Sequence, residues 1–173
     1  SLCGMPHWNC DIGGFFAGQY NLSDGTATRN PLYQELFVRW LQFGTFTPMM
    51  RSHGADTPRE VYLFGKEGEP VYDAIVKMIR LRYSLLPYIY STSWEVTNSQ
   101  STFMRALMMD FPKDSRVLDM GDEYMFGRAL LVAPVLNAQY TSEKEVRMDA
   151  LTGWNSDNKG TAGSADAPVD FTK

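Results

Sequence analysis

The chain has 173 residues, of which 44% are hydrophobic and 21% are charged, a composition that excludes disorder along its whole length. Its 16 Lys and Arg side chains against 20 Asp and Glu side chains leave a net charge of -4, which argues against a nucleic-acid binder. No apolar run reaches the roughly 18 residues of a membrane-spanning helix. The two cysteines and two histidines do not have the spacing of a structural zinc site.

The first part of the chain predicts a strand followed by a helix. Residues 3–8 are an apolar run that predicts a buried strand, and Asp11 marks the change into a polar loop. Asn30 followed by Pro31 is a strong helix start, because asparagine caps a helix well and proline fits its first turn. Apolar residues recur behind this start at helical spacing, so we expect a helix that ends near Gly44.

A second strand and a second helix follow in the same order. Residues 46–50 are another short apolar run, and the polar residues 51–54 close it. Glu69 followed by Pro70 predicts the next helix, which Pro87 should kink or split. The order strand, helix, strand, helix fits βα units of a parallel sheet, so the predicted fold class is α/β.

The second half of the chain differs in composition. Residues 103–111 are largely apolar, and residues 124–135 should hold at least one buried strand. Residues 152–168 are mostly Gly, Ser, Asn, Asp, Thr and Ala, which predicts a flexible linker or a long loop over residues 152–173. About two βα units fit before this change, whereas a complete (β/α)8 barrel takes about 250 residues, so the chain is too short to be one.

Polar residues follow both predicted strands. Asp11 comes after the first strand, and Arg51 and His53 come after the second. In βα barrels the carboxyl ends of the strands form the active face, so these three side chains predict a polar site. The alternative is that Asp11 caps the turn at Gly13 and Gly14, while Arg51 and His53 bond to loop carbonyls.

Six blocks of sequence occur in a fixed order between residues 4 and 136. They are WNCDIGGF at 8–15, ELFVRWLQFG at 35–44, RSHG at 51–54, LRYSLLPYIY at 81–90, MRAL at 104–107, and FG at 126–127 with LVAPV at 131–135. In this order and at these spacings they resemble the motifs of glycoside hydrolase family 31. That family consists mainly of retaining α-glycosidases on a (β/α)8 barrel, including α-glucosidases and α-xylosidases.

The resemblance implies an arrangement of domains. Residues 1–100 would be the C-terminal part of a (β/α)8 TIM barrel, namely its last two βα units, with residues 4–11 as the seventh strand and residues 46–50 as the eighth. Residues 101–151 would begin a proximal β-domain, a β-sandwich. Residues 152–173 would be the linker or long loop that the composition predicts.

The resemblance also implies where the bond-breaking chemistry lies. A retaining glycosidase needs two carboxyl groups about 5–5.5 Å apart, one as nucleophile and one as acid/base. In this family both belong to earlier barrel strands, so we expect them upstream of Ser1 and expect no catalytic residue in this chain. The parent protein would be the enzyme, hydrolysing terminal α-linked glucose or xylose with retention, and this chain alone would be inactive. No metal or organic cofactor is implied.

The chain would instead supply part of the sugar-binding subsite. By the resemblance, Asp11 and His53 hydrogen-bond sugar hydroxyls, and carboxylate and imidazole groups have suitable acceptors and donors. Trp8 and Phe15 would offer apolar walls to the sugar ring, and Arg51 would orient a carboxylate, that of Asp11. For Trp8, Phe15 and Arg51 the alternative is core packing or a structural ion pair.

The expected partners are a glycoside or oligosaccharide substrate and the remainder of the parent polypeptide. Two units of an eight-unit barrel leave strand edges unpaired and helix faces bare, so we also expect self-association of this chain by itself. Neither a nucleic acid nor a membrane is an expected partner. Two other functions stay open: a non-catalytic carbohydrate-binding relative, and a structural α/β module without a sugar site.

Overall fold

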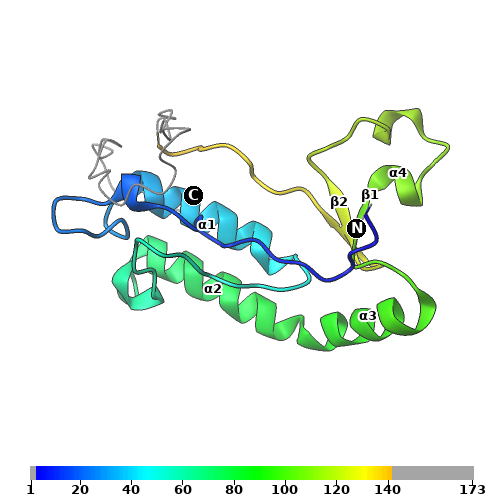
Figure 1. Ribbon diagram of the computed structural model, residues 1–173, viewed down its shortest axis with the longest axis horizontal. Helices are drawn as coiled ribbons and strands as arrows, with labels where there is room; N and C mark the ends of the chain where they lie inside the picture. Colours follow the sequence, from blue (N-terminus) through cyan, green and yellow to red (C-terminus); the bar gives the residue numbers. More distant parts are fainter. Residues whose placement is uncertain (1–2, 142–173) are drawn as a thin grey trace.

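A pair of long helices and a small sheet form the described part of the chain. The computed structural model describes residues 3–141. Helices α1 (Pro31–Thr45) and α2 (Pro70–Ser84) lie side by side, and α3 (Leu86–Ser99) continues from α2 towards the sheet (Figure 1). The other elements are the strands β1 (Met104–Ala106), β2 (Tyr124–Phe126) and β3 (Leu130–Val132), the short helix α4 (Leu107–Asp110), and 3-10 turns at Gly18–Tyr20, Val61–Leu63 and Ser115–Val117.

Helix α1 begins where the sequence predicts. The Asn30 side chain accepts a hydrogen bond from the Leu32 amide at 3.0 Å, and Pro31 occupies the first turn. The helix ends at Thr45, next to the predicted end near Gly44. Its apolar face packs against α2 in the first of two apolar clusters, which contains Tyr33, Phe37, Val38, Leu41, Phe64, Val71 and Ile75.

The predicted break at Pro87 separates α2 from α3. Helix α2 ends at Ser84, Leu85 lies between the helices, and Pro87 stands in the first turn of α3. A proline there has no amide to complete the hydrogen-bond ladder of α2, but the first turn of a helix does not need one. The sequence prediction of a split helix is therefore confirmed.

The two strands predicted in the first half of the chain are not formed. Residues 4–11 and 46–50 have no strand ladder, and a single isolated parallel bridge joins Ile12 to Ser52 just beyond them. The two segments run side by side in the predicted parallel direction. The ladder is missing because no third strand lies beside either segment within residues 3–141, and an isolated pair of strands is only marginally stable.

The second half of the chain folds as an antiparallel sheet in the order β1-β2-β3. Met104 stands opposite Phe126, and Tyr124 stands opposite Val132. This confirms the strand predicted within residues 124–135. The second apolar cluster joins the sheet to α3 and contains Ile89, Val96, Phe103, Met104, Phe126 and Val132.

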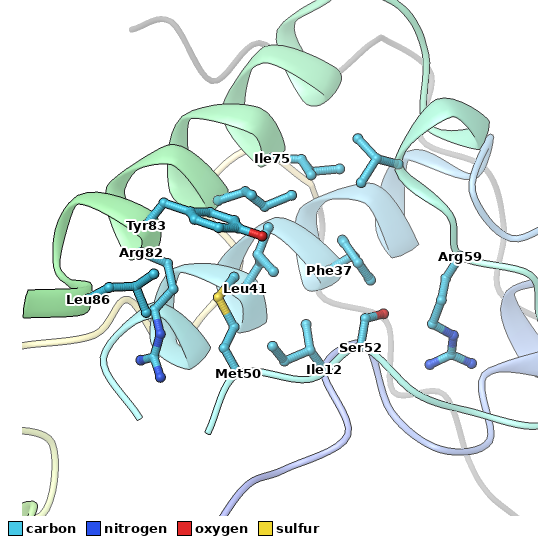
Figure 2. Close-up of a pocket in the computed structure, with 12 residues that line it drawn as sticks. Ile12, Phe37, Leu41, Met50, Ser52, Arg59, Ile75, Arg82, Tyr83 and Leu86 are labelled. Atoms are coloured by element: carbon cyan, nitrogen blue, oxygen red, sulfur yellow. The ribbon is translucent and has the colours of Figure 1, made fainter. Parts of the chain in front are cut away.

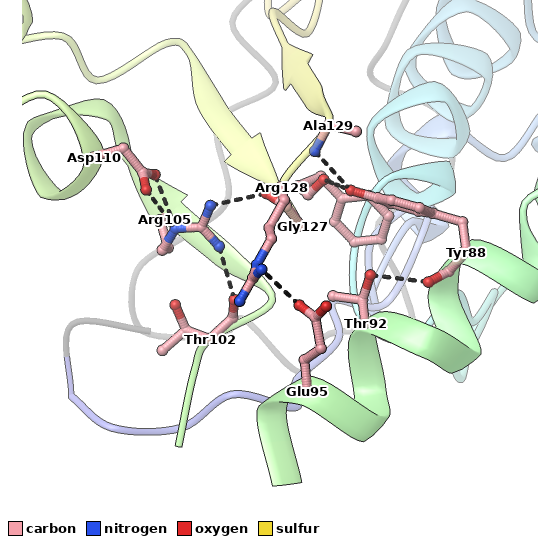
Figure 3. A network of polar contacts seen from close by, with 10 residues as sticks. Tyr88, Thr92, Glu95, Thr102, Arg105, Asp110, Gly127, Arg128 and Ala129 are labelled. Atoms are coloured by element: carbon pink, nitrogen blue, oxygen red, sulfur yellow. Dashed lines mark hydrogen bonds and ion pairs between the residues drawn. The ribbon is translucent and has the colours of Figure 1, made fainter. Parts of the chain in front are cut away.

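Polar contacts also attach α3 to the turn between β2 and β3 (Figure 3). The Tyr88 hydroxyl on α3 donates to the Phe126 carbonyl at 2.8 Å and accepts from the Ala129 amide at 3.0 Å. From the other side, Arg105 on β1 donates to the Gly127 carbonyl at 2.9 Å. The turn is thus held by a helix and by a neighbouring strand.

The segment that follows β3 runs back along α1 (Figure 1). It is bound there by the buried carboxylate of Glu35, which accepts hydrogen bonds from the amides of Gln139 at 2.7 Å, Tyr140 at 3.1 Å and Thr141 at 2.7 Å. The Thr141 hydroxyl adds a fourth at 2.7 Å. One acidic side chain therefore ties the end of the described chain to its first long helix.

No helix within residues 3–141 is long and apolar enough to span a bilayer. The predicted linker or loop at residues 152–173 lies outside the described residues.

Candidate functional site

The predicted site residues lie on two loops that meet backbone to backbone. We call residues 11–18 the first site loop and residues 51–59 the second site loop. The Ile12 amide donates to the Arg51 carbonyl at 3.1 Å, and further along the Ala55 amide donates to the Phe15 carbonyl at 3.0 Å. The two loops are therefore brought together over most of their length.

Asp11 and Arg51 form an ion pair across these loops. An oxygen of the Asp11 carboxylate lies 2.6 Å from the Arg51 Nη2 atom, and the two side chains are 26% and 54% exposed. An ion pair this exposed contributes little to stability. The turn behind Asp11 is closed by its backbone carbonyl, which accepts from the Gly14 amide at 2.8 Å. The carboxylate of Asp11 thus pairs with Arg51 instead of capping the turn.

The rings of Phe15 and His53 contact each other, and these residues follow Asp11 and Arg51 on the same two loops. Their ring centroids are 5.4 Å apart, with the ring planes inclined by 61°. Both side chains are exposed, so the imidazole is free to offer its donor and acceptor to a ligand. The Phe15 ring places an apolar surface beside these polar groups.

Trp8 does not join the other predicted site residues. Its ring packs against Phe43 with 6.3 Å between centroids, and it borders the second apolar cluster. The four residues that the two site loops hold together are Asp11, Phe15, Arg51 and His53. Within the described residues Trp8 packs against other side chains, as the alternative predicts, and its role as an apolar wall of the sugar subsite stays a prediction.

Sequence reasoning missed two charged residues of the second site loop. The Asp56 carboxylate accepts hydrogen bonds from the Ala17 and Gly18 amides, each at 2.8 Å. Arg59 is 8% exposed and bonds to backbone carbonyls of both site loops. A loop has no periodicity that would separate a buried charge from a solvated one, so the sequence predicted only a polar loop here.

An apolar hollow of about 450 Å³ lies beneath the site, between α1, α2 and the two parallel segments (Figure 2). Among the described residues no carboxylate lines it. Most of its lining is apolar, and its polar lining residues are Ser52, Arg59, Arg82 and Tyr83. At its edge Arg82 of α2 donates to the carbonyls of Thr45, Thr47 and Pro48 at 2.8, 2.6 and 2.9 Å. Burial lowers the pKa of Arg82. The hollow therefore resembles a gap between packed side chains more than a polar substrate cleft.

The arrangement has the groups needed to bind a hydroxylated ligand. The two site loops carry two carboxylates, and that of Asp56 is already engaged by two amides. Retaining glycoside cleavage needs two carboxyl groups that reach the same glycosidic bond. The Asp11 carboxylate, which Arg51 holds, can bind and orient a hydroxylated ligand together with the neighbouring His53 imidazole and Phe15 ring.

Polar and aromatic side chains gathered where two parallel segments end, with helices packed behind them, are typical of the binding face of an α/β barrel protein. Comparison with known proteins identifies the family. Residues 1–92 match the glycosyl hydrolases family 31 TIM-barrel domain, and residues 100–165 match the glycosyl hydrolase family 31 C-terminal domain. The chain belongs to glycoside hydrolase family 31.

Individual relatives agree with this assignment. The chain is 42% identical over 154 residues to the alpha-xylosidase of Saccharolobus solfataricus, an alignment that covers 89% of this chain and 19% of that protein. The crystal structure of the GH31 alpha-xylosidase from Xanthomonas citri is 44% identical, with a TM-score of 0.71 over 79% of this chain and 15% of that one. The GH31 dextranase of Flavobacterium johnsoniae, solved with isomaltotriose, is 36% identical, with a TM-score of 0.64 over 78% of this chain and 15% of that one. The chain thus spans about a fifth or less of the length of these relatives.

Proposed function

We propose that this chain supplies part of the sugar-binding subsite of a retaining α-glycosidase that acts on terminal α-linked xylose or glucose. The observation that carries the proposal is the meeting of the Asp11–Arg51 ion pair and the Phe15–His53 ring pair on two adjacent loops of a family 31 chain. Asp11 and His53 bind hydroxyls of the sugar, Phe15 packs against its ring, and Arg51 orients the Asp11 carboxylate. Relatives named alpha-xylosidase and alpha-glucosidase support this substrate class.

The proposal includes an arrangement of domains. Residues 1–100 form the last two βα units of the catalytic barrel, and residues 101–151 begin the β-sandwich domain that follows it. The nucleophile and the acid/base belong to another part of the whole protein. The parallel bridge between Ile12 and Ser52 supports this assignment, because neighbouring barrel strands run parallel.

The first experiment compares the whole protein with the 173-residue chain on an aryl α-xyloside and an aryl α-glucoside. We expect hydrolysis by the whole protein and none by the chain, with the faster substrate identifying the sugar. Hydrolysis by the chain alone would overturn the placement of the catalytic carboxylates and make Asp11 the first candidate nucleophile. Sugar binding without hydrolysis by the whole protein would favour a carbohydrate-binding relative.

His53→Ala in the whole protein is expected to lower kcat/KM by about 10- to 100-fold, because a hydroxyl of the bound sugar loses its partner in a desolvated subsite. The other histidine of the chain gives a matched control. His7 lies outside the two site loops and meets the edge of Phe103, with 5.7 Å between ring centroids, so His7→Ala should change kcat/KM far less than His53→Ala does. Equal kcat/KM for His53→Ala and the unmodified protein would remove His53 from the subsite.

A further inference from the structure

A single buried side chain connects the backbones of the two site loops. Arg59 Nη1 donates to the Gly14 carbonyl at 2.5 Å and to the His53 carbonyl at 3.1 Å, and its Nε donates to the Thr57 carbonyl at 3.1 Å. The guanidinium is planar, and its donors have fixed directions. It therefore sets the separation of the two loops as well as holding them together.

The two carbonyls that accept hydrogen bonds from Arg59 lie in the backbone next to the Phe15 and His53 rings. Gly14 immediately precedes Phe15, and the second carbonyl belongs to His53 itself. The rings of Phe15 and His53 are the two that meet at 5.4 Å. Moving or removing the Arg59 guanidinium would thus shift the two exposed rings relative to each other.

The space for this guanidinium exists because residue 54 is a glycine. A Cβ added at Gly54 would lie 2.0 Å from Arg59 Nη2 and 2.3 Å from its Cζ atom. The Nη2 atom is buried and has no hydrogen-bond partner within residues 3–141. A buried unpaired nitrogen lowers stability, so the net contribution of Arg59 to folding is reduced while its hold on the loops remains.

Asp56 fastens the other end of the first site loop. Its carboxylate accepts from Ala17 and Gly18, and the Asn21 side chain donates to the Asp56 carbonyl at 3.2 Å. The first site loop is therefore attached to the second near Gly14 and again near Gly18. Because Asp56 holds only the far end, loss of the attachment at Gly14 would leave the backbone that carries Phe15 free to move relative to His53.

We propose that Arg59 is a positioning residue of the sugar subsite, which sets the geometry of His53 and Phe15 through the Gly14 and His53 carbonyls. The proposal rests on the proposed function of this site. Arg59 acts on the sugar through the two loops and is not itself a group that the sugar touches. Because misplacement by about 1 Å of groups that bind a substrate can lower a rate by about 100-fold, its loss should be visible in the kinetics.

The test is a double-mutant cycle in the whole protein with Arg59→Met and His53→Ala, assayed on the better aryl glycoside. Arg59→Met alone should lower kcat/KM by about tenfold or more, and by a clearly smaller factor when His53 is already alanine, because only the positioning of Phe15 is then lost. Arg59→Lys, which keeps a charged donor group, should show a smaller loss than Arg59→Met. Gly54→Ala should reproduce Arg59→Met, because its Cβ displaces the guanidinium.

Arg80→Met is the matched control, because Arg80 is exposed on α2 and its side chain makes no hydrogen bond within the described residues. It should leave kcat/KM unchanged. A purely structural Arg59 would lower the melting temperature and leave kcat and KM of the folded protein as they were. That result would overturn the proposal. So would a double mutant whose loss of kcat/KM equals the product of the losses in the two single mutants.

Hydrogen exchange separates this proposal from the proposed function. If the unmodified whole protein neither hydrolyses nor binds the sugars, the proposed function fails, and the positioning of a sugar subsite fails with it. The attachment of the loops is then tested by itself. Arg59→Met should speed exchange of the Ala55 amide, which donates to the Phe15 carbonyl, and Arg80→Met should not. Unchanged exchange in an active protein would contradict the attachment and overturn the proposal.

Discussion

Glu35→Ala is expected to release residues 139–141 from α1 and to lower the free energy of unfolding by about 3 kcal/mol. The buried carboxylate accepts three amide hydrogen bonds and one hydroxyl hydrogen bond from that segment. Hydrogen bonds to a charged acceptor are worth about 1.5–3 kcal/mol each. The loss is smaller than their sum because the bonds form one network and the freed amides can bind water.

The direct measurement for Glu35→Ala is hydrogen exchange at the amides of Gln139, Tyr140 and Thr141, together with the urea midpoint of unfolding. All three amides should lose their protection. Glu60→Gln is the control, because Glu60 is exposed and its side chain caps no helix. Protection that survives in Glu35→Ala would mean that another contact holds the segment to α1.

The same contact makes part of the stability depend on acid pH. Burial raises the pKa of the Glu35 carboxyl, but the hydrogen bonds from Gln139, Thr141 and Tyr140 together outweigh burial and lower it below its usual 4.5. The folded protein therefore binds this proton more weakly than the unfolded chain, and the stabilisation is present above pH 4.5 and lost as the pH falls through the lower folded pKa. The urea midpoints of wild type and Glu35→Gln should therefore differ at neutral pH, and the difference should narrow only as the pH falls below 4.5.

Gly13→Ala is expected to lower the free energy of unfolding by about 3–4 kcal/mol. Gly13 has a φ of +87°, where an L-residue is strained by about 1–2 kcal/mol. The added Cβ would also lie 2.7 Å from a ring carbon of Phe37 and 2.7 Å from the Tyr33 hydroxyl, both on α1. These side chains are almost fully buried in the first apolar cluster, so neither can move aside freely.

Gly25→Ala separates the two contributions to the Gly13 effect. Gly25 has a similar φ of +80°, but a Cβ there would meet no atom within 4 Å. It should therefore show the backbone strain alone, about 1–2 kcal/mol, measured by urea unfolding of both variants. Equal losses in the two variants would show that the contact with α1 does not limit the position of the first site loop.

Features that depend on neighbouring residues could be predicted from the sequence. Asn30 and Pro31 start α1 through a cap and a ring that act within one turn, and Pro87 splits a helix by lacking its own amide. The grouping of Asp11 with Arg51 also followed, because each comes directly after one of two parallel segments. The ordered motifs predicted the family, which the matches to both of its domains confirm.

Only the tertiary structure showed which charged side chains bond to residues far away in the sequence. Arg59 bonds to Gly14 across 45 positions, and Glu35 bonds to Thr141 across 106. Burial makes each of these charges important, and burial is created by packing of distant segments. The structure also decided that residues 4–11 and 46–50 lie parallel without forming strands, since a strand needs hydrogen-bonding neighbours that its own sequence does not contain.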